Sequence, residues 1–304
     1  GVEYGTGGIY EENFGVRLGL STRFGADHSF RSNYNSRRDQ LNASFSKGYD
    51  DKVGEYGYEA GIRRSDNSVS ADVRGDYISN RFEARAAYIS SGSDFDTIGD
   101  SNTAFLQIGS SIAYAGGKVA IGRPINDSFV IASPHESLRE EQVIIGDQLR
   151  DNEYEAESGW FGPALASRVY SYSRQDIAYD LKDAPPGTDI GTGIETLNPP
   201  YRSGYVLTVG TEANVSAVGT LILSGTPGSL LVGRVEGIDD PDYEATAFFT
   251  NSVGRFAVVG LKAGNSYRIK LNDQDIDFEI EVPDNGTNLV RLGEVNLDLP
   301  NGGK

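Results

Sequence analysis

The chain has 304 residues, a net charge of −17 and no cysteine, which excludes disulfide frameworks and cysteine metal sites. Residues 1–124 hold 14 Lys and Arg against 16 Asp and Glu, whereas residues 125–304 hold 13 against 28. Such an acidic second part excludes ordinary nucleic-acid binding, which needs clustered cationic side chains. No apolar stretch is long enough for a transmembrane helix, so the sequence indicates either a soluble protein or a membrane β-barrel.

Residues 1–124 alternate between apolar and polar side chains, the period of a β-strand. Between Phe14 and Phe24, for example, apolar residues fall on one face, and glycine, serine and arginine fall on the other. We expect eight or nine such strands, joined by short polar turns as hairpin neighbours. The arginines of the polar faces are candidates for lining a wet lumen, or else ordinary solvent-facing residues. They are Arg17, Arg23, Arg63, Arg74 and Arg85.

Alternation alone does not separate a soluble sandwich from a membrane barrel, because both have one apolar and one polar face. Three features favour the barrel. The strands approach nine to eleven residues, Tyr and Phe gather toward their ends, and the polar face mixes glycine with charge. The strands would close a narrow barrel or form the last part of a wider one.

The stretch Tyr114–Pro134 marks a border, because all eleven prolines lie from Pro124 onward. Gly116 and Gly117 predict a hairpin turn, and Lys118–Arg123 would be the last barrel strand. The chain lacks methionine and begins at Gly1 within a strand-like pattern, so we expect a fragment or processed portion of a longer protein.

Residues 125–203 are predicted to form a small β-domain that ends in a proline-rich segment. Residues 204–304 are predicted to form a second β-sandwich, because short strands follow one another at eight-to-twelve-residue spacing. Its predicted strands are Tyr205–Val209, Val218–Leu223, Leu231–Val235, Ala245–Thr250, Arg255–Val259, Ser266–Leu271, Asp277–Val282 and Asn288–Asn296.

Signals for catalysis are nearly absent. His28 and His135 are the only histidines, and neither accompanies a nucleophile. The acidic series Asp273, Asp275, Asp277, Glu279 and Glu281 lacks the glycine of a calcium loop, since Phe278 stands there, and we interpret it as the wetted face of one strand. We expect no enzyme activity, no catalytic residue, no cofactor and no metal site.

Four motifs resemble outer-membrane ushers of the chaperone–usher pilus (fimbrial) biogenesis pathway. In order they are AYAGGKVAIGRPINDSFVIASP, DAPPGTDIG, LNPPYRSGYVLTVG and FFTNSVGRFAVVGLKAG. The resemblance covers most of the chain and is strongest from about residue 105. The fourth motif alone would be weak, because similar modules are attached to many enzymes and transporters.

The resemblance implies an all-β protein with three parts. Residues 1–124 would be the C-terminal strands of a transmembrane β-barrel in the Gram-negative outer membrane. Residues 125–203 and 204–304 would be two periplasmic β-sandwich domains of Ig-like or transthyretin-like type.

The implied function is pilus assembly and protein transport. Ushers recruit periplasmic chaperone–subunit complexes, support polymerisation by donor-strand exchange and secrete the pilus through the barrel. The expected partners are therefore chaperone–pilin complexes and outer-membrane lipid. The acidic domains are expected to steer basic faces of the incoming complex.

No residue can be assigned to partner contact from the sequence; Phe248, Phe249 and Phe256 are predicted to be core. One alternative is another outer-membrane β-barrel protein, an adhesin or transporter with sandwich extensions. A second is a secreted carbohydrate-active enzyme, which would need paired carboxylates that the sequence does not show.

Overall fold

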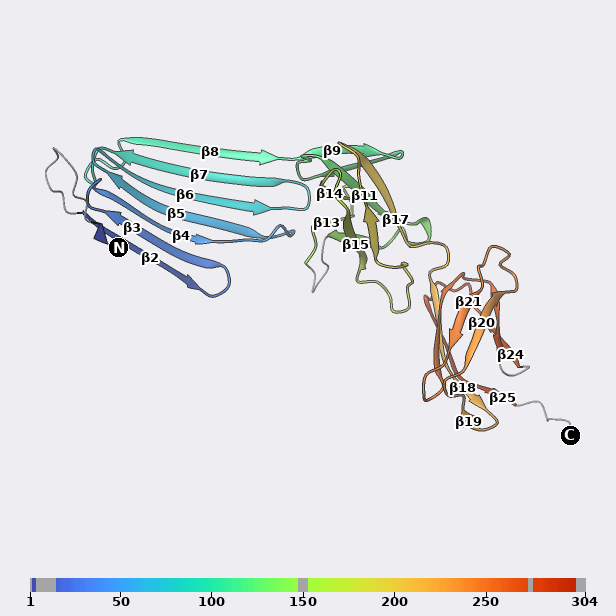
Figure 1. Cartoon of the computed structure of the whole chain (residues 1–304). Coiled ribbons are helices and arrows are strands. Elements are labelled where there is room, and N and C mark those ends of the chain that lie inside the picture. Colours follow the sequence, from blue (N-terminus) through green and yellow to red (C-terminus); the bar gives the residue numbers. More distant parts are fainter. Residues whose placement is uncertain (1, 4–14, 147–152, 273–275, 299–304) are drawn as a thin grey trace.

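The structure is a computed structural model that describes residues 2–3, 15–146, 153–272 and 276–298. In these ranges every element is a β-strand except one 3-10 turn, η1 (Glu136–Leu138). The all-β prediction is therefore confirmed. Figure 1 shows three parts in chain order: a broad sheet at the N-terminal side, a small middle unit and a last unit at the C-terminal side.

The N-terminal part is one eight-stranded antiparallel sheet in which each strand pairs with its chain neighbours. The hairpin pairing predicted for residues 1–124 is confirmed as far as β8. In the described residues β1 and β8 form the two edges, and no pairing joins them. The strands are β1 (Val2–Glu3), β2 (Gly15–Phe24), β3 (His28–Asn35), β4 (Gln40–Lys47), β5 (Tyr56–Ser65), β6 (Ser68–Ile78), β7 (Glu83–Gly92) and β8 (Ser101–Gly109).

The next two strands, β9 (Ser111–Ala115) and β10 (Lys118–Gly122), form a separate hairpin. Its turn is the predicted one, since Gly116 and Gly117 both have positive φ, which a two-residue hairpin turn of this kind requires. Lys118–Arg123, predicted as the last barrel strand, does not continue the eight-stranded sheet: in the described part of the chain β10 pairs with β9 alone. One side of this hairpin is buried against the middle unit.

The middle unit is a sandwich of two sheets, with strand orders β14-β11-β17 and β13-β12-β15-β16. Side chains from both sheets form one buried core. The strands are β11 (Ser128–Pro134), β12 (Gln142–Gly146), β13 (Ala156–Glu157), β14 (Ala164–Val169), β15 (Gln175–Lys182), β16 (Ile194–Leu197) and β17 (Gly204–Val209).

Strand β17 pairs in parallel with β11, so it belongs to the middle unit. The prediction that Tyr205–Val209 opens the last sandwich is therefore wrong, and the middle unit extends past residue 203. The physical reason is burial: Val209 is buried in the middle core, with Tyr205 and Leu207 packed against it.

Strand β11 is covered on both of its sides. Val130 and Ala132 point into the sandwich core, whereas Ile131 packs with Leu165 of β14 against Ala113 and Ala120 of the hairpin. This double burial explains the nearly continuous apolar run of β11, which resembles a central strand rather than an alternating one.

The last unit is a sandwich of two four-stranded sheets, β21-β20-β23-β24 and β19-β18-β22 with β25 paired in parallel to β18. All eight predicted strands are confirmed as strands within a few residues, and seven of them belong to this unit. The strands are β18 (Val215–Leu223), β19 (Thr226–Pro227), β20 (Val232–Gly237), β21 (Thr246–Phe249), β22 (Arg255–Leu261), β23 (Ser266–Leu271), β24 (Asp277–Glu281) and β25 (Leu289–Leu297).

The aromatic core of the last unit agrees in part with the sequence. Phe248 and Phe256 are buried 5.1 Å apart between ring centroids, as predicted, but Phe249 is 59% exposed, so its assignment to the core is wrong. Phe249 follows Phe248 on one strand and must face the opposite side.

Strand β24 has the predicted wetted and buried faces. Asp277, Glu279 and Glu281 are exposed, and Phe278 and Ile280 are buried. Asp273 and Asp275 lie outside the described residues, as does Phe14 in the N-terminal part.

Among the described residues, no helix has the length and apolar character that a membrane-crossing helix needs.

The double burial of the β11–β14 layer gives a first prediction. Leu165→Ala removes a side chain that is 1% exposed and contacts both the hairpin and β11. We expect a loss of about 2–5 kcal/mol in unfolding free energy, measured by guanidinium denaturation. Leu230→Ala, at a side chain that is 73% exposed, is the control and should change the value by less than about 0.5 kcal/mol. Equal effects of the two variants would contradict the packing.

Candidate functional site

The eight-stranded sheet has one polar face, formed by alternate residues of every strand. The cross-strand register places all five candidate arginines on this face. The sequence prediction that Arg17, Arg23, Arg63, Arg74 and Arg85 share a face is therefore confirmed by the pairing, while their role in lining a lumen stays a prediction.

Three strands of this face carry a chain of ion pairs. Arg74 of β6 lies 3.0 Å from Glu59 of β5 and 3.3 Å from Asp76 of β6. Asp76 also accepts a hydrogen bond of 2.5 Å from Nε of Arg85 on β7. Arg63 pairs with Asp72 at 3.6 Å. Opposite charges therefore alternate across β5, β6 and β7 on the polar face.

The other face of the sheet is apolar and uncovered. Many of its large side chains are exposed, with Val69 a buried exception, whereas side chains of the same types form the buried cores of both sandwiches. Two apolar residues, Ile89 and Phe105, lie instead on the polar face, next to the edge strand β8. The exposed side chains of the apolar face include Leu18, Leu20, Phe24, Phe45, Val73, Tyr77, Tyr88, Leu106 and Ile108.

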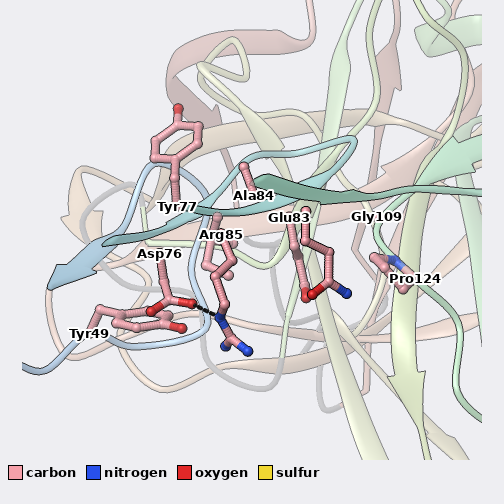
Figure 2. Close-up of a pocket in the computed structure, with 10 residues that line it drawn as sticks. Tyr49, Asp76, Tyr77, Glu83, Ala84, Arg85, Gly109 and Pro124 are labelled. Atoms are coloured by element: carbon pink, nitrogen blue, oxygen red, sulfur yellow. Dashed lines mark hydrogen bonds and ion pairs between the residues drawn. The ribbon is translucent and has the colours of Figure 1, made fainter. Parts of the chain in front are cut away.

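A small cavity of about 120 Å³ lies at the end of the sheet nearest the middle unit (Figure 2). Tyr49, Asp76 and Arg85 line it on the polar face, and Pro124 closes its other side. The Tyr49 ring packs directly over Gly57, where any Cβ would collide with it.

The sheet is joined to the middle unit by the turn between β6 and β7. The Arg81 guanidinium donates four hydrogen bonds to backbone carbonyls: Ile121 at 2.7 Å, Pro163 at 2.8 Å, and Glu157 and Gly162 at 3.1 Å each. Burial lowers the pKa of Arg81 from its ordinary value, while nearby Glu157 opposes that shift. Hydrogen bonds from a charged guanidinium are strong and directional. The four bonds of Arg81 therefore fix the position of the β6–β7 turn relative to the middle unit.

Asn80 makes two further bonds beside Arg81. Its side chain donates to the Glu157 carbonyl at 2.9 Å and accepts from the Glu157 amide at 3.0 Å. The Glu157 carboxylate in turn accepts from Tyr154 at 2.7 Å and from Lys182 at 2.8 Å. Hydrogen bonding to Glu157 raises the pKa of Lys182, and burial raises the pKa of the Tyr154 hydroxyl. Glu157 is therefore the common acceptor at this contact.

A second set of contacts is centred on Asp51, in the connection between β4 and β5. It forms ion pairs with Arg123, which has no exposed surface, and with Arg168 at 2.8 Å. Arg168 also contacts Glu83 at 3.2 Å. The Nε atom of Arg123 is buried without a partner among the described atoms. Together with Arg81 and Asn80, these residues form what we call the joint.

The sequence gives no signal for the joint residues. Asn80 and Arg81 lie in a short polar turn of ordinary composition, and Asp51 lies in a polar loop. Their role depends on contacts with residues far away in the sequence, and a local sequence pattern does not predict such contacts.

A second cavity, of about 380 Å³, lies between the middle and last units. The two units are connected there by a 2.7 Å hydrogen bond from Asn288 to Thr188 and a 3.1 Å bond from Asn214 to Ser137. Among its charged lining residues five are acidic, and Arg139 is the one basic residue. The acidic side chains are Glu136, Glu140, Glu141, Glu212 and Asp284.

The histidines have structural positions. His28 lies 3.1 Å from the Tyr58 hydroxyl and stacks on Phe45, whereas His135 caps η1 by accepting from the amide of Ser137. The described part of the chain holds no group of three or more His, Cys, Asp and Glu residues that would bind a metal ion.

Comparisons with known proteins give structural neighbours only. No family model matches the sequence, and no curated protein matches it. A chain of the E. coli P pilus tip assembly intermediate PapC-PapD-PapK-PapG is 14% identical with a TM-score of 0.48, over 99% of this chain and 36% of that one. This chain thus spans about a third of that neighbour's length.

Two Gram-positive proteins are more distant neighbours. The Bacillus anthracis TIE protein is 12% identical, with a TM-score of 0.23, over 93% of this chain and 58% of its own. A streptococcal ancillary pilin is 11% identical, with a TM-score of 0.21, over 81% of this chain and 82% of its own.

The joint gives a second prediction. Because the chain has no native cysteine, spin labels can be placed at Thr103→Cys in β8 and Ser173→Cys in the middle unit. We expect a narrow distance distribution by pulsed electron resonance, and a broad one after Arg81→Ala, because hydrogen bonds to a charged group are worth about 1.5–3 kcal/mol each.

Arg74→Ala is the control, since it removes an arginine of the same sheet that does not contact the middle unit. An unchanged distribution in Arg81→Ala would show that the joint does not depend on that side chain.

Proposed function

We propose that this chain acts in a chaperone–usher pathway as an outer-membrane usher. In this proposal the eight-stranded sheet forms part of a transmembrane barrel, and the middle and last units are periplasmic domains. The chain recruits chaperone–subunit complexes and supports their polymerisation, and the fibre leaves through the barrel.

The observation that carries the proposal is the two-sided character of the sheet. An uncovered apolar face across eight strands is unfavourable in water, whereas lipid is the surroundings it fits. The opposite face, with its alternating Arg and Asp or Glu, fits a wet lumen. The nine-to-eleven-residue length of most strands suits a tilted crossing of the hydrocarbon layer.

The four usher-like motifs occupy the connections of the structure. The first runs from Ala113 within β9 through β10 and β11, and the third contains β17, so together they include the parallel pair of the middle unit. The second contributes Thr188 to the bond between the two sandwiches, and the fourth forms the β21–β22 turn. This distribution supports a role in positioning the two units.

The proposed assembly mechanism is the addition of a β-strand and involves no covalent chemistry. In donor-strand exchange, an incomplete subunit sandwich receives its missing strand first from the chaperone and then from the next subunit. The usher supplies proximity and orientation, which raise the effective concentration of the incoming strand. Hydrogen bonding of the added strand and burial of its side chains then drive the exchange.

The acidic cavity between the middle and last units is our candidate docking site for a basic face of the incoming complex. Five carboxylates around one concave region create a negative potential that attracts cationic side chains. Such steering raises the association rate and is weakened by salt.

A labelling experiment tests the membrane sheet. In the protein in outer membranes, single cysteines on the polar face, at Arg17 and Arg63, should react with a membrane-impermeant maleimide. Cysteines on the apolar face, at Leu20 and Ala71, should react only after solubilisation and unfolding, because lipid covers them. Equal reactivity on both faces would overturn the barrel.

A truncation tests the assembly function. Removing residues 212–304 leaves β17 and hence both sheets of the middle unit intact. We expect normal membrane insertion and no surface fibres, scored by electron microscopy of cells that also produce the chaperone and subunits. A truncation after residue 203, which also removes β17, should in addition destabilise the middle unit. Fibres from the first truncation would contradict the function assigned to the last unit.

Charge substitutions test the docking site. We expect Glu140→Gln, Glu141→Gln and Glu212→Gln together to reduce the association rate with chaperone–subunit complexes by about tenfold at low salt. The control is Asp277→Asn, Glu279→Gln and Glu281→Gln, an equal loss of charge on β24. An association rate that changes neither with salt nor with the three substitutions at the cavity would disprove steering there.

A further inference from the structure

The apolar face of the sheet continues beyond the last sheet strand. On β8, Leu106 and Ile108 lie on the apolar face and are 70% and 63% exposed. Two-residue steps onward from Ile108 reach Ser110, Ile112 and Tyr114. Ile112 and Tyr114 belong to the hairpin and are 77% and 69% exposed.

The hairpin has its own inside and outside. Ala113 and Ala120 are buried against Ile131 and Leu165, so this side faces the middle unit. The outer side carries two cross-strand pairs, Ile112 with Ile121 and Tyr114 with Val119. All four outer side chains are exposed, and none is charged.

The polar face of the sheet continues to the inside of the hairpin in the same way. Gln107 and Gly109 line the small polar cavity beside Pro124, and the Ser111 hydroxyl donates to the Arg123 carbonyl at 2.6 Å. The middle unit therefore covers the hairpin on the polar-face side. The outer side is left as an extension of the apolar face.

An exposed aromatic turn lies next to β10. Trp160, the only tryptophan of the chain, is 92% exposed and packs edge-on against Phe161 with ring centroids 4.8 Å apart. The turn is held beside the hairpin by Arg81, which donates to the carbonyls of both Gly162 and Ile121. Tryptophan and tyrosine are the side chains that prefer the boundary between lipid and water.

We propose that the outer side of the β9–β10 hairpin, together with Trp160 and Phe161, inserts into the phospholipid headgroup layer of the membrane that the sheet spans. We call this surface the interfacial anchor. The inference rests on the proposed membrane location of the sheet. β8 has nine residues, the length that crosses the hydrocarbon layer, so the residues that follow it enter the headgroup layer.

The anchor specifies where the middle unit lies. Through Ile131 and Leu165 the hairpin is packed to the middle unit, and through its outer side it contacts lipid. The middle unit would then be held against the membrane surface at the lumen side of the barrel wall, where an incoming subunit must pass. Hydrophobic contact, rather than charge, holds it there, so salt should not release it.

Fluorescence of single tryptophans tests the proposal in the intact chain, reconstituted into vesicles of phosphatidylethanolamine and phosphatidylglycerol with bromine-labelled acyl chains. Wild-type Trp160 is one reporter. In a Trp160→Phe background, Tyr114→Trp reports on the hairpin, Leu106→Trp on the sheet, and Phe249→Trp on the last unit. We expect bromine quenching and blue-shifted emission for Trp160, Tyr114→Trp and Leu106→Trp, and strong acrylamide quenching without bromine quenching for Phe249→Trp.

The outcomes separate the two proposals. Bromine quenching at Leu106→Trp, with only acrylamide quenching at Tyr114→Trp and Trp160, would overturn the anchor and leave the membrane sheet standing. Absence of bromine quenching at Leu106→Trp as well would overturn the membrane sheet itself. As a second variant, Ile112→Glu with Val119→Glu changes two exposed side chains, so folding should persist, and bromine quenching of Trp160 should fall. Unchanged quenching in that variant would also count against the anchor.

Discussion

The structure depends on one constraint: neighbouring residues of a strand point to opposite faces, and in the large sheet one face is polar and the other is apolar. Across the eight-stranded sheet the residues of one face pair with residues of the same face on the next strand. The ion-paired residues of the polar face therefore gather on β5, β6 and β7. A slip of one residue would place Arg74 and Asp76 on the apolar face and break the ion pairs with Glu59 and Arg85. The chain of ion pairs on β5, β6 and β7 therefore favours this register of the strands and makes this face of the sheet polar.

The joint fixes the orientation of the two-sided sheet relative to the middle unit. Arginine is suited to the task because its planar group donates to several carbonyls at once and keeps its charge when half buried. Arg123 has a harder position, with no exposed surface and one nitrogen without a partner among the described atoms. Its pairing with Asp51 offsets part of the cost of burying the charge. Such a buried pair contributes geometric specificity more than stability.

Local pattern predicted much of the fold. Alternation gave the strands of the large sheet, and the glycine, asparagine and proline turns gave the strands of the last unit, because both signals are carried by residues close in sequence. Partnership between strands is a long-range property. Lys118–Gly122 alternates like a sheet strand but lies on the middle unit, and Tyr205–Val209 pairs backward across more than seventy residues with β11. The same limit applies to the joint: the side chains of Asn80 and Arg81 contact residues 40 to 82 positions away, and Arg123 pairs with Asp51 across 72 positions.

The parallel pairing of β11 with β17 has a mechanical consequence. The chain enters the middle unit at the start of β11 and leaves it at the end of β17, and six residue pairs hold these two strands side by side. Tension between the large sheet and the last unit pulls the two strands in opposite directions along their length. The ladder is then loaded in shear, so its hydrogen bonds share the force instead of opening one after another. A middle unit connected in this way resists stretching along the chain, because all six residue pairs must yield together.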